Sequence, residues 1–78
     1  MAPLTLLEAV APRERILHVS AAVAAPTPFF AQILEEVVSV IDGASGEHWT
    51  VIRGANLTEP AAHDAGEQVV LLAIAFEG

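Results

Sequence analysis

The chain has 78 residues with no lysine and no cysteine, and its three arginines against ten acidic residues give a net charge of −7. Because phosphate groups are bound through clustered cations, this charge argues against nucleic acid or an anionic membrane as a partner. Without disulfides, a single domain of this size has a core that gives little net stability. The hydrophobic content of 54% therefore favours burial of apolar surface between subunits.

Residues 1–13 are predicted to form an N-terminal arm. Pro3 and Pro12 bracket a segment whose apolar side chains fit a short helix or an extended chain equally well. These side chains are Leu4, Leu6, Leu7 and Val10. We expect the arm to be an appendage that docks on a neighbouring subunit. It has no basic region of the kind that begins a secretory signal, so a cytoplasmic protein is expected.

Residues 14–78 are predicted to form one domain, which begins with a strand at 15–24. Apolar side chains occupy alternate positions in this strand, as in a sheet with one apolar face. They are Leu17, Val19, Ala21 and Val23. The apolar stretch that continues to residue 41 is interrupted by prolines and glutamates, so no membrane-spanning segment is expected.

A helix is expected at 28–41. Thr27 is a suitable N-cap, and Pro28 at the first helical position loses no needed hydrogen bond. Apolar residues then recur at the spacing of one helical face. They are Phe30, Ile33, Leu34, Val37 and Ile41. Gly43 follows Asp42 and can take the left-handed conformation that ends a helix.

Two further strands are expected, at 48–53 and 68–76, with a long polar connection over 56–67. The resulting order is β-α-β-β, an α+β fold in which one helix packs on one face of a three-stranded antiparallel sheet. The last two strands are expected to pair as a hairpin.

The last strand also predicts assembly, because it is apolar on both of its faces. A single helix covers only one face of the sheet. The other face must then be buried against something else, most simply a second copy of the chain, so a homo-oligomer is expected.

The residue types do not indicate an enzyme or a metal site. His18, His48 and His63 lack the short spacing typical of zinc ligands, and isolated surface or strand-end histidines are the expectation. There is no cysteine nucleophile, and the serines lack a nucleophile-elbow context. Glu35 and Glu36 are expected on a solvated helix face.

Trp49 is the one candidate binding residue that stands out from the residues alone. As the only tryptophan, at the start of a strand, it could anchor a subunit interface or provide a stacking platform for a flat aromatic ligand. Both interpretations stay open at this point.

A further set of features runs through residues 14–76. They are the step Ala24-Ala25-Pro26 after a strand, the following helix, Trp49, Arg53-Gly54, and Gln68-Val69-Val70-Leu71 at the start of the last strand. In these features the chain resembles the dodecins, small flavin-binding proteins of β-α-β-β topology that form hollow dodecamers. The resemblance implies that Trp49 stacks on the isoalloxazine ring and that Gln68 contacts the flavin. The cofactor would be FMN, FAD or riboflavin.

Two functions are therefore expected as alternatives. One is a small homo-oligomeric protein that sequesters a flavin on Trp49. The other is a non-enzymatic structural or interaction module, such as a phage or shell component or a small regulator that binds a larger protein. A flavin carrier should purify yellow or quench added riboflavin, and an interaction module should do neither.

Overall fold

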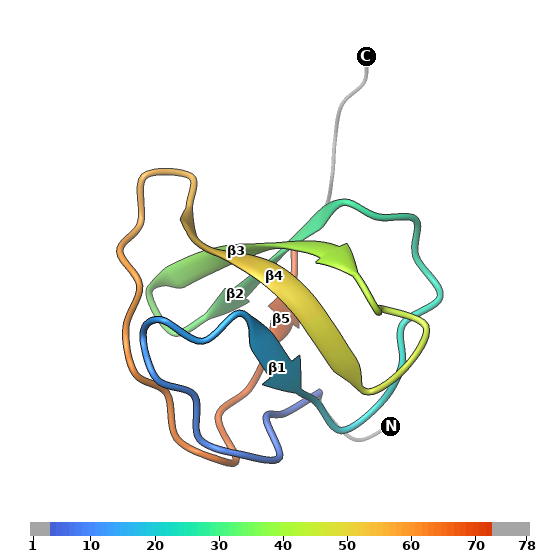
Figure 1. Cartoon of the computed structure of the whole chain (residues 1–78), viewed down its shortest axis with the longest axis horizontal. Coiled ribbons are helices and arrows are strands. Elements are labelled where there is room, and N and C mark those ends of the chain that lie inside the picture. Colours follow the sequence, from blue (N-terminus) through green and yellow to red (C-terminus); the bar gives the residue numbers. More distant parts are fainter. Residues whose placement is uncertain (1–3, 73–78) are drawn as a thin grey trace.

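The computed structural model describes residues 4–72, and every regular element in this range is a β-strand. The strands are β1 (Ile16–His18), β2 (Phe29–Ile33), β3 (Glu36–Asp42), β4 (His48–Ala55) and β5 (Val70–Leu71). They form one antiparallel sheet in the order β1-β4-β3-β2-β5, which curls into a half-barrel (Figure 1). Within residues 4–72, no helix is long and apolar enough to cross a bilayer.

The α+β fold predicted from the sequence is wrong, because the expected helix at 28–41 is the hairpin of β2 and β3. The buried side chains alternate along β2, at Phe29, Ala31 and Ile33. On β3, Glu36, Val38 and Val40 continue this alternation, and Val37 is buried as well. The helical spacing is a coincidence, since Leu34 and Ile41 are exposed and Phe30 is only half-buried. The β-branched residues of β3 also favour a strand over a helix.

The expected strands agree with the structure only in part. The strand expected at 15–24 coincides with β1 over three residues, and the one at 48–53 coincides with β4. The hairpin expected between the last two strands is wrong, because β4 lies between β1 and β3 while β5 pairs with β2. Val70 and Leu71, expected to be buried, are exposed. Of the strand expected at 68–76, only Val70 and Leu71 form β5, and residues 73–76 lie outside the described residues.

The N-terminal segment connects the two edges of the curled sheet. Isolated bridges join Leu6 with Val19 on one side, and Thr5 with Gln68 and Val10 with His63 on the other. Leu6 and Val10 are buried in the core of their own chain. Residues 4–10, expected as an arm reaching a neighbouring subunit, thus pack within the fold and pair the segment after β1 with the segment before β5.

The core fills the inside of the curl, and Trp49 is its largest fully buried side chain. Its indole Nε1 donates a hydrogen bond to the carbonyl of Gly46 at 3.0 Å. Its ring meets Phe29 edge to face, with the centroids 5.7 Å apart. A buried indole with its only donor satisfied is a packing residue in this fold.

Candidate functional site

The first residue of β3, Glu36, is a buried carboxylate. It follows the two-residue turn after β2 and pairs with Ile33, and its side chain points inward with only 1% of the residue exposed. A charge in this position is costly unless it is fully hydrogen-bonded. Two consecutive residues of β4 provide part of this hydrogen bonding. Arg53 donates to both carboxylate oxygens of Glu36 at 2.8 Å, and the backbone amide of Gly54 donates to Oε2 at 3.0 Å.

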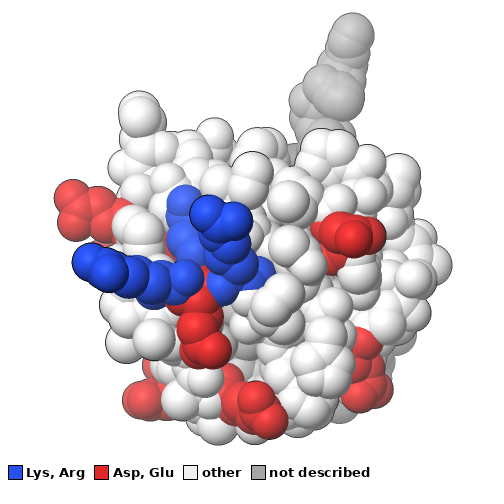
Figure 2. Space-filling model, in the orientation of Figure 1, with Lys and Arg blue, Asp and Glu red and all other residues white. Residues whose placement is uncertain are grey.

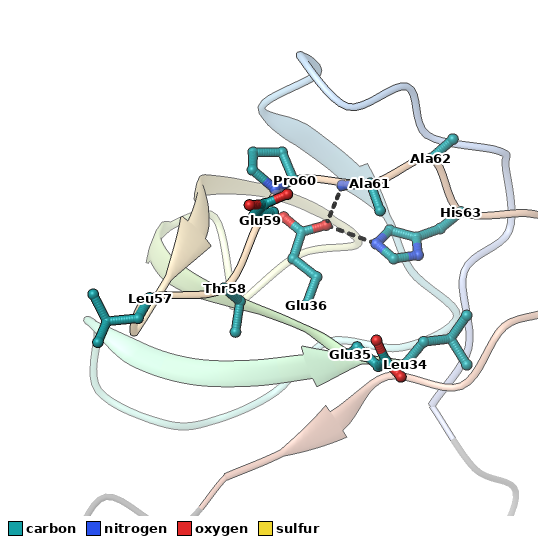
Figure 3. A pocket seen from close by; sticks show the side chains of 10 residues that line it. All are labelled: Leu34, Glu35, Glu36, Leu57, Thr58, Glu59, Pro60, Ala61, Ala62 and His63. Carbon is teal, nitrogen blue, oxygen red and sulfur yellow. Dashed lines mark hydrogen bonds and ion pairs between the residues drawn. The ribbon is translucent and has the colours of Figure 1, made fainter.

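The segment after β4 supplies the remaining bonds to Glu36. The amide of Ala61 donates to Oε1 at 3.1 Å, and Nε2 of His63 lies 2.7 Å from the same oxygen (Figure 3). The other ring nitrogen of His63, Nδ1, lies 3.2 Å from Oε1 of Glu67. Carboxylate oxygens only accept hydrogen bonds, so both nitrogens of His63 donate when the ring is protonated.

Arg53 extends this network to the N-terminal segment. Its Nη1 donates to the carbonyls of Ala11 at 2.7 Å and Glu14 at 2.8 Å, and its Nη2 donates to the carbonyl of Ala61 at 2.6 Å. The planar guanidinium suits this role because it presents several donors in fixed directions. One side chain therefore joins the N-terminal segment, β3, β4 and the following loop.

The electrostatics of Glu36 keep it ionised. Burial raises the pKa of its carboxyl, but the hydrogen bonds from Arg53, His63 and the amides of Ala61 and Gly54 outweigh burial and lower the pKa from 4.5 to about 2. A carboxylate with so low a pKa is a weak base at neutral pH, and its oxygens already accept five hydrogen bonds.

Next to this network lies a surface groove of about 780 Å³. Its outer lining is formed by the turn between β2 and β3 and by the loop after β4, and includes Leu34, Glu35, Leu57, Glu59, Pro60 and Ala61. In Figure 3, Leu34 and Leu57 lie toward opposite ends of this lining, with Glu36 between them. We call this feature the leucine-edged groove.

Both leucines stand in turns with unusual backbone angles. Leu57 follows Asn56 in a turn where both φ angles are positive, 67° and 56°, and Leu57 is fully exposed at 103%. Leu34 opens the turn between β2 and β3 with a φ of 55° and is 65% exposed. Glycine or asparagine usually occupies such positions, because a Cβ atom strains the left-handed conformation and only the short polar side chain of asparagine offsets this strain by local hydrogen bonds. The two leucines therefore gain little from burial within the chain.

The structure places the two residues expected to bind flavin in different surroundings. Trp49 has 0% exposure, so neither face of its ring is open to a stacking ligand. Gln68 is exposed and pairs through its backbone with Thr5. Stacking of a flavin on Trp49 would thus require the core to open.

The histidines were expected to be isolated surface or strand-end residues, and His18 and His48 do lie at strand ends, the end of β1 and the start of β4. His63 is buried in the Glu36 network. His18 and His48 face each other across β1 and β4 with stacked rings, whose centroids are 4.2 Å apart. Within residues 4–72, the histidine and acidic side chains form no group of three that could hold a metal ion.

The Glu36 network was missed because Glu36 was assigned to a solvated helix face, an expectation the structure corrects. In a strand, Glu36 shares its parity with Val38 and Val40, which are buried. A glutamate on the apolar parity of a valine-rich strand needs a cationic partner, and the chain has only three cations to offer. That pattern was the available signal.

Comparison with family models, with curated proteins and with solved structures finds no match to this chain. The β-α-β-β topology implied by the resemblance to the dodecins is contradicted by the all-β fold.

Proposed function

We propose that the protein is a non-enzymatic interaction module that binds another protein chain through the leucine-edged groove. The observation that carries this proposal is Leu57, a fully exposed apolar side chain at a turn position where glycine is usual. In the isolated chain, Leu57 strains the backbone and its side chain buries no apolar area. Contact with a partner would supply that missing burial.

Leu34 supports the proposal from the other side of the groove. It too is a large apolar side chain held at a positive φ and exposed to solvent. Single exposed leucines are ordinary on protein surfaces. Leu34 and Leu57, however, both have a strained backbone and border the same groove. A shared role in binding a partner chain explains this better.

The buried polar network is better suited to holding the groove in shape than to catalysis. Glu36 and His63 lie on the groove, but each faces protein groups that take up its polar atoms. Arg53 is similarly occupied by backbone carbonyls. A network of this kind fixes the loop after β4, which carries most of the residues that line the groove.

Photo-crosslinking tests this proposal in cells that produce the protein naturally. Benzoylphenylalanine replaces Leu57, and in a control chain it replaces Ser45, an exposed residue in the loop before β4. We expect a discrete adduct with a protein chain from position 57, weakened by Leu34→Asn in the same chain. Adducts no stronger than those from position 45 would refute the proposal.

A further inference from the structure

We infer that the chain bound in the leucine-edged groove is a second copy of this protein, presented through the surface that carries Arg13 and Arg15. This inference rests on the proposed function and names the partner. Its basis is that one molecule carries two surfaces with exposed apolar side chains and opposite charge.

The groove is the acidic member of the pair. Glu35 and Glu59 are exposed on its lining, and neither takes part in an ion pair within residues 4–72. No arginine lies among the described residues that line it. A partner must therefore bring apolar side chains for Leu34 and Leu57 and cations for the two glutamates.

The basic member is a depression on the outer side of β3 and β4, which we call the arginine face. It has a volume of about 730 Å³ and is lined by Arg13, Arg15, Ile41 and Ile52, among others. Both isoleucines are exposed, at 42% and 54%. Figure 2 shows that the blue arginine atoms gather in one patch, whereas the red acidic atoms are dispersed over the visible surface.

Arg13 and Arg15 are the cations that remain for an external partner. The guanidinium of the third arginine, Arg53, is taken up by Glu36 and by backbone carbonyls. Within residues 4–72, neither Arg13 nor Arg15 makes a side-chain hydrogen bond or ion pair. A chain of net charge −7 that keeps its two free arginines beside exposed isoleucines has a surface suited to an acidic, apolar groove such as its own.

Charge reversal with complementation tests the inference by sedimentation velocity. The parent chain should form oligomers at concentrations up to about 0.1 mM, which weaken as salt is added. Arg13→Glu with Arg15→Glu, and separately Glu35→Arg with Glu59→Arg, should each lower the association constant by about tenfold or more. An equimolar mixture of the two variants restores opposite charges at both contacts, so it should assemble again.

A matched control changes the same amount of charge elsewhere. Glu8→Arg with Asp64→Arg alters two exposed acidic residues outside the groove lining, and this variant should assemble at least as well as the parent. A parent chain that stays monomeric, or a mixture that fails to assemble, would overturn the inference. If position 57 then crosslinks to a different protein, the proposed function stands and only the identity of the partner is refuted.

Discussion

Nε2 of His63 lies 2.7 Å from Oε1 of Glu36, and this contact joins the segment before β5 to the first residue of β3. The backbone of His63 also exchanges hydrogen bonds with Val10 in the N-terminal segment. The connection between the sheet edges is therefore coupled to the ionisation of one buried carboxylate. Loss of that charge should loosen both the N-terminal segment and the loop that forms the groove.

The first prediction concerns acid. The folded-state pKa of Glu36 is lowered to about 2 from 4.5, so its ionised form stabilises the fold fully above about pH 4.5. This contribution, on the order of 3 kcal/mol, should be lost as the pH falls towards 2. Urea unfolding between pH 7 and pH 2 measures it in the parent and in Glu36→Gln.

At pH 7 the free energy of unfolding of Glu36→Gln should be lower than that of the parent. As the pH falls towards 2, it should decrease less than that of the parent, because the variant has no carboxylate at position 36 to protonate. Curves for the two proteins that run parallel through this pH range would show that the carboxylate is not the group responsible.

The second prediction concerns Arg53. Arg53→Lys keeps the charge but removes the planar set of donors that reaches Glu36, Ala11 and Glu14 together. Lysine cannot reach all these acceptors at once, so buried acceptors are left unpaired and the free energy of unfolding should fall by about 1–3 kcal/mol. Arg13→Lys, on the exposed surface, is the control and should change little. A loss below about 1 kcal/mol in Arg53→Lys would mean that the network contributes little to stability.

The third prediction separates crowding from backbone strain at two glycines with positive φ. A Cβ at Gly54 would lie 2.7 Å from Cδ of Pro60, whereas a Cβ at Gly66 would meet nothing within 4 Å. Gly66→Ala should therefore cost only the strain of its backbone, about 1 kcal/mol, and Gly54→Ala should cost clearly more. Thermal unfolding of both variants provides the comparison. Equal losses would mean that Pro60 and the loop after β4 yield to the added methyl group.

The sequence predicted the strand at 48–53, which has clear boundaries, better than the hairpin of β2 and β3. The strand at 48–53 agrees with β4, in which Trp49 and Val51 are buried and alternate with the less buried His48, Thr50 and Ile52. The hairpin of β2 and β3 was mistaken for a helix because apolar residues fill both parities there, which leaves periodicity unable to decide. The turn between β2 and β3 also has leucine, Leu34, at a position of positive φ where glycine is usual. The sequence therefore gave no sign that the chain reverses there.

The candidate site could not be predicted because its parts converge only in the folded chain. Glu36, Arg53 and His63 are separated by 17 residues and then 10 along the chain, and no short motif connects them. The surroundings of the residues expected to bind flavin were also beyond the reach of the sequence. Trp49 was judged by its chemistry, and whether its ring faces the core or the solvent depends on the strand pairing that was mispredicted.

The free energy of unfolding of Leu57→Asn, measured in dilute solution where the chain is monomeric, tests the central claim most directly. Asparagine tolerates the left-handed conformation better than leucine, and the exposed Leu57 side chain contributes no burial within the chain. If Leu57 is kept for contact with another chain, the variant should be as stable as the parent or more stable by up to about 1 kcal/mol. A variant less stable than the parent by about 1 kcal/mol or more would show that Leu57 serves its own fold, and would contradict the account.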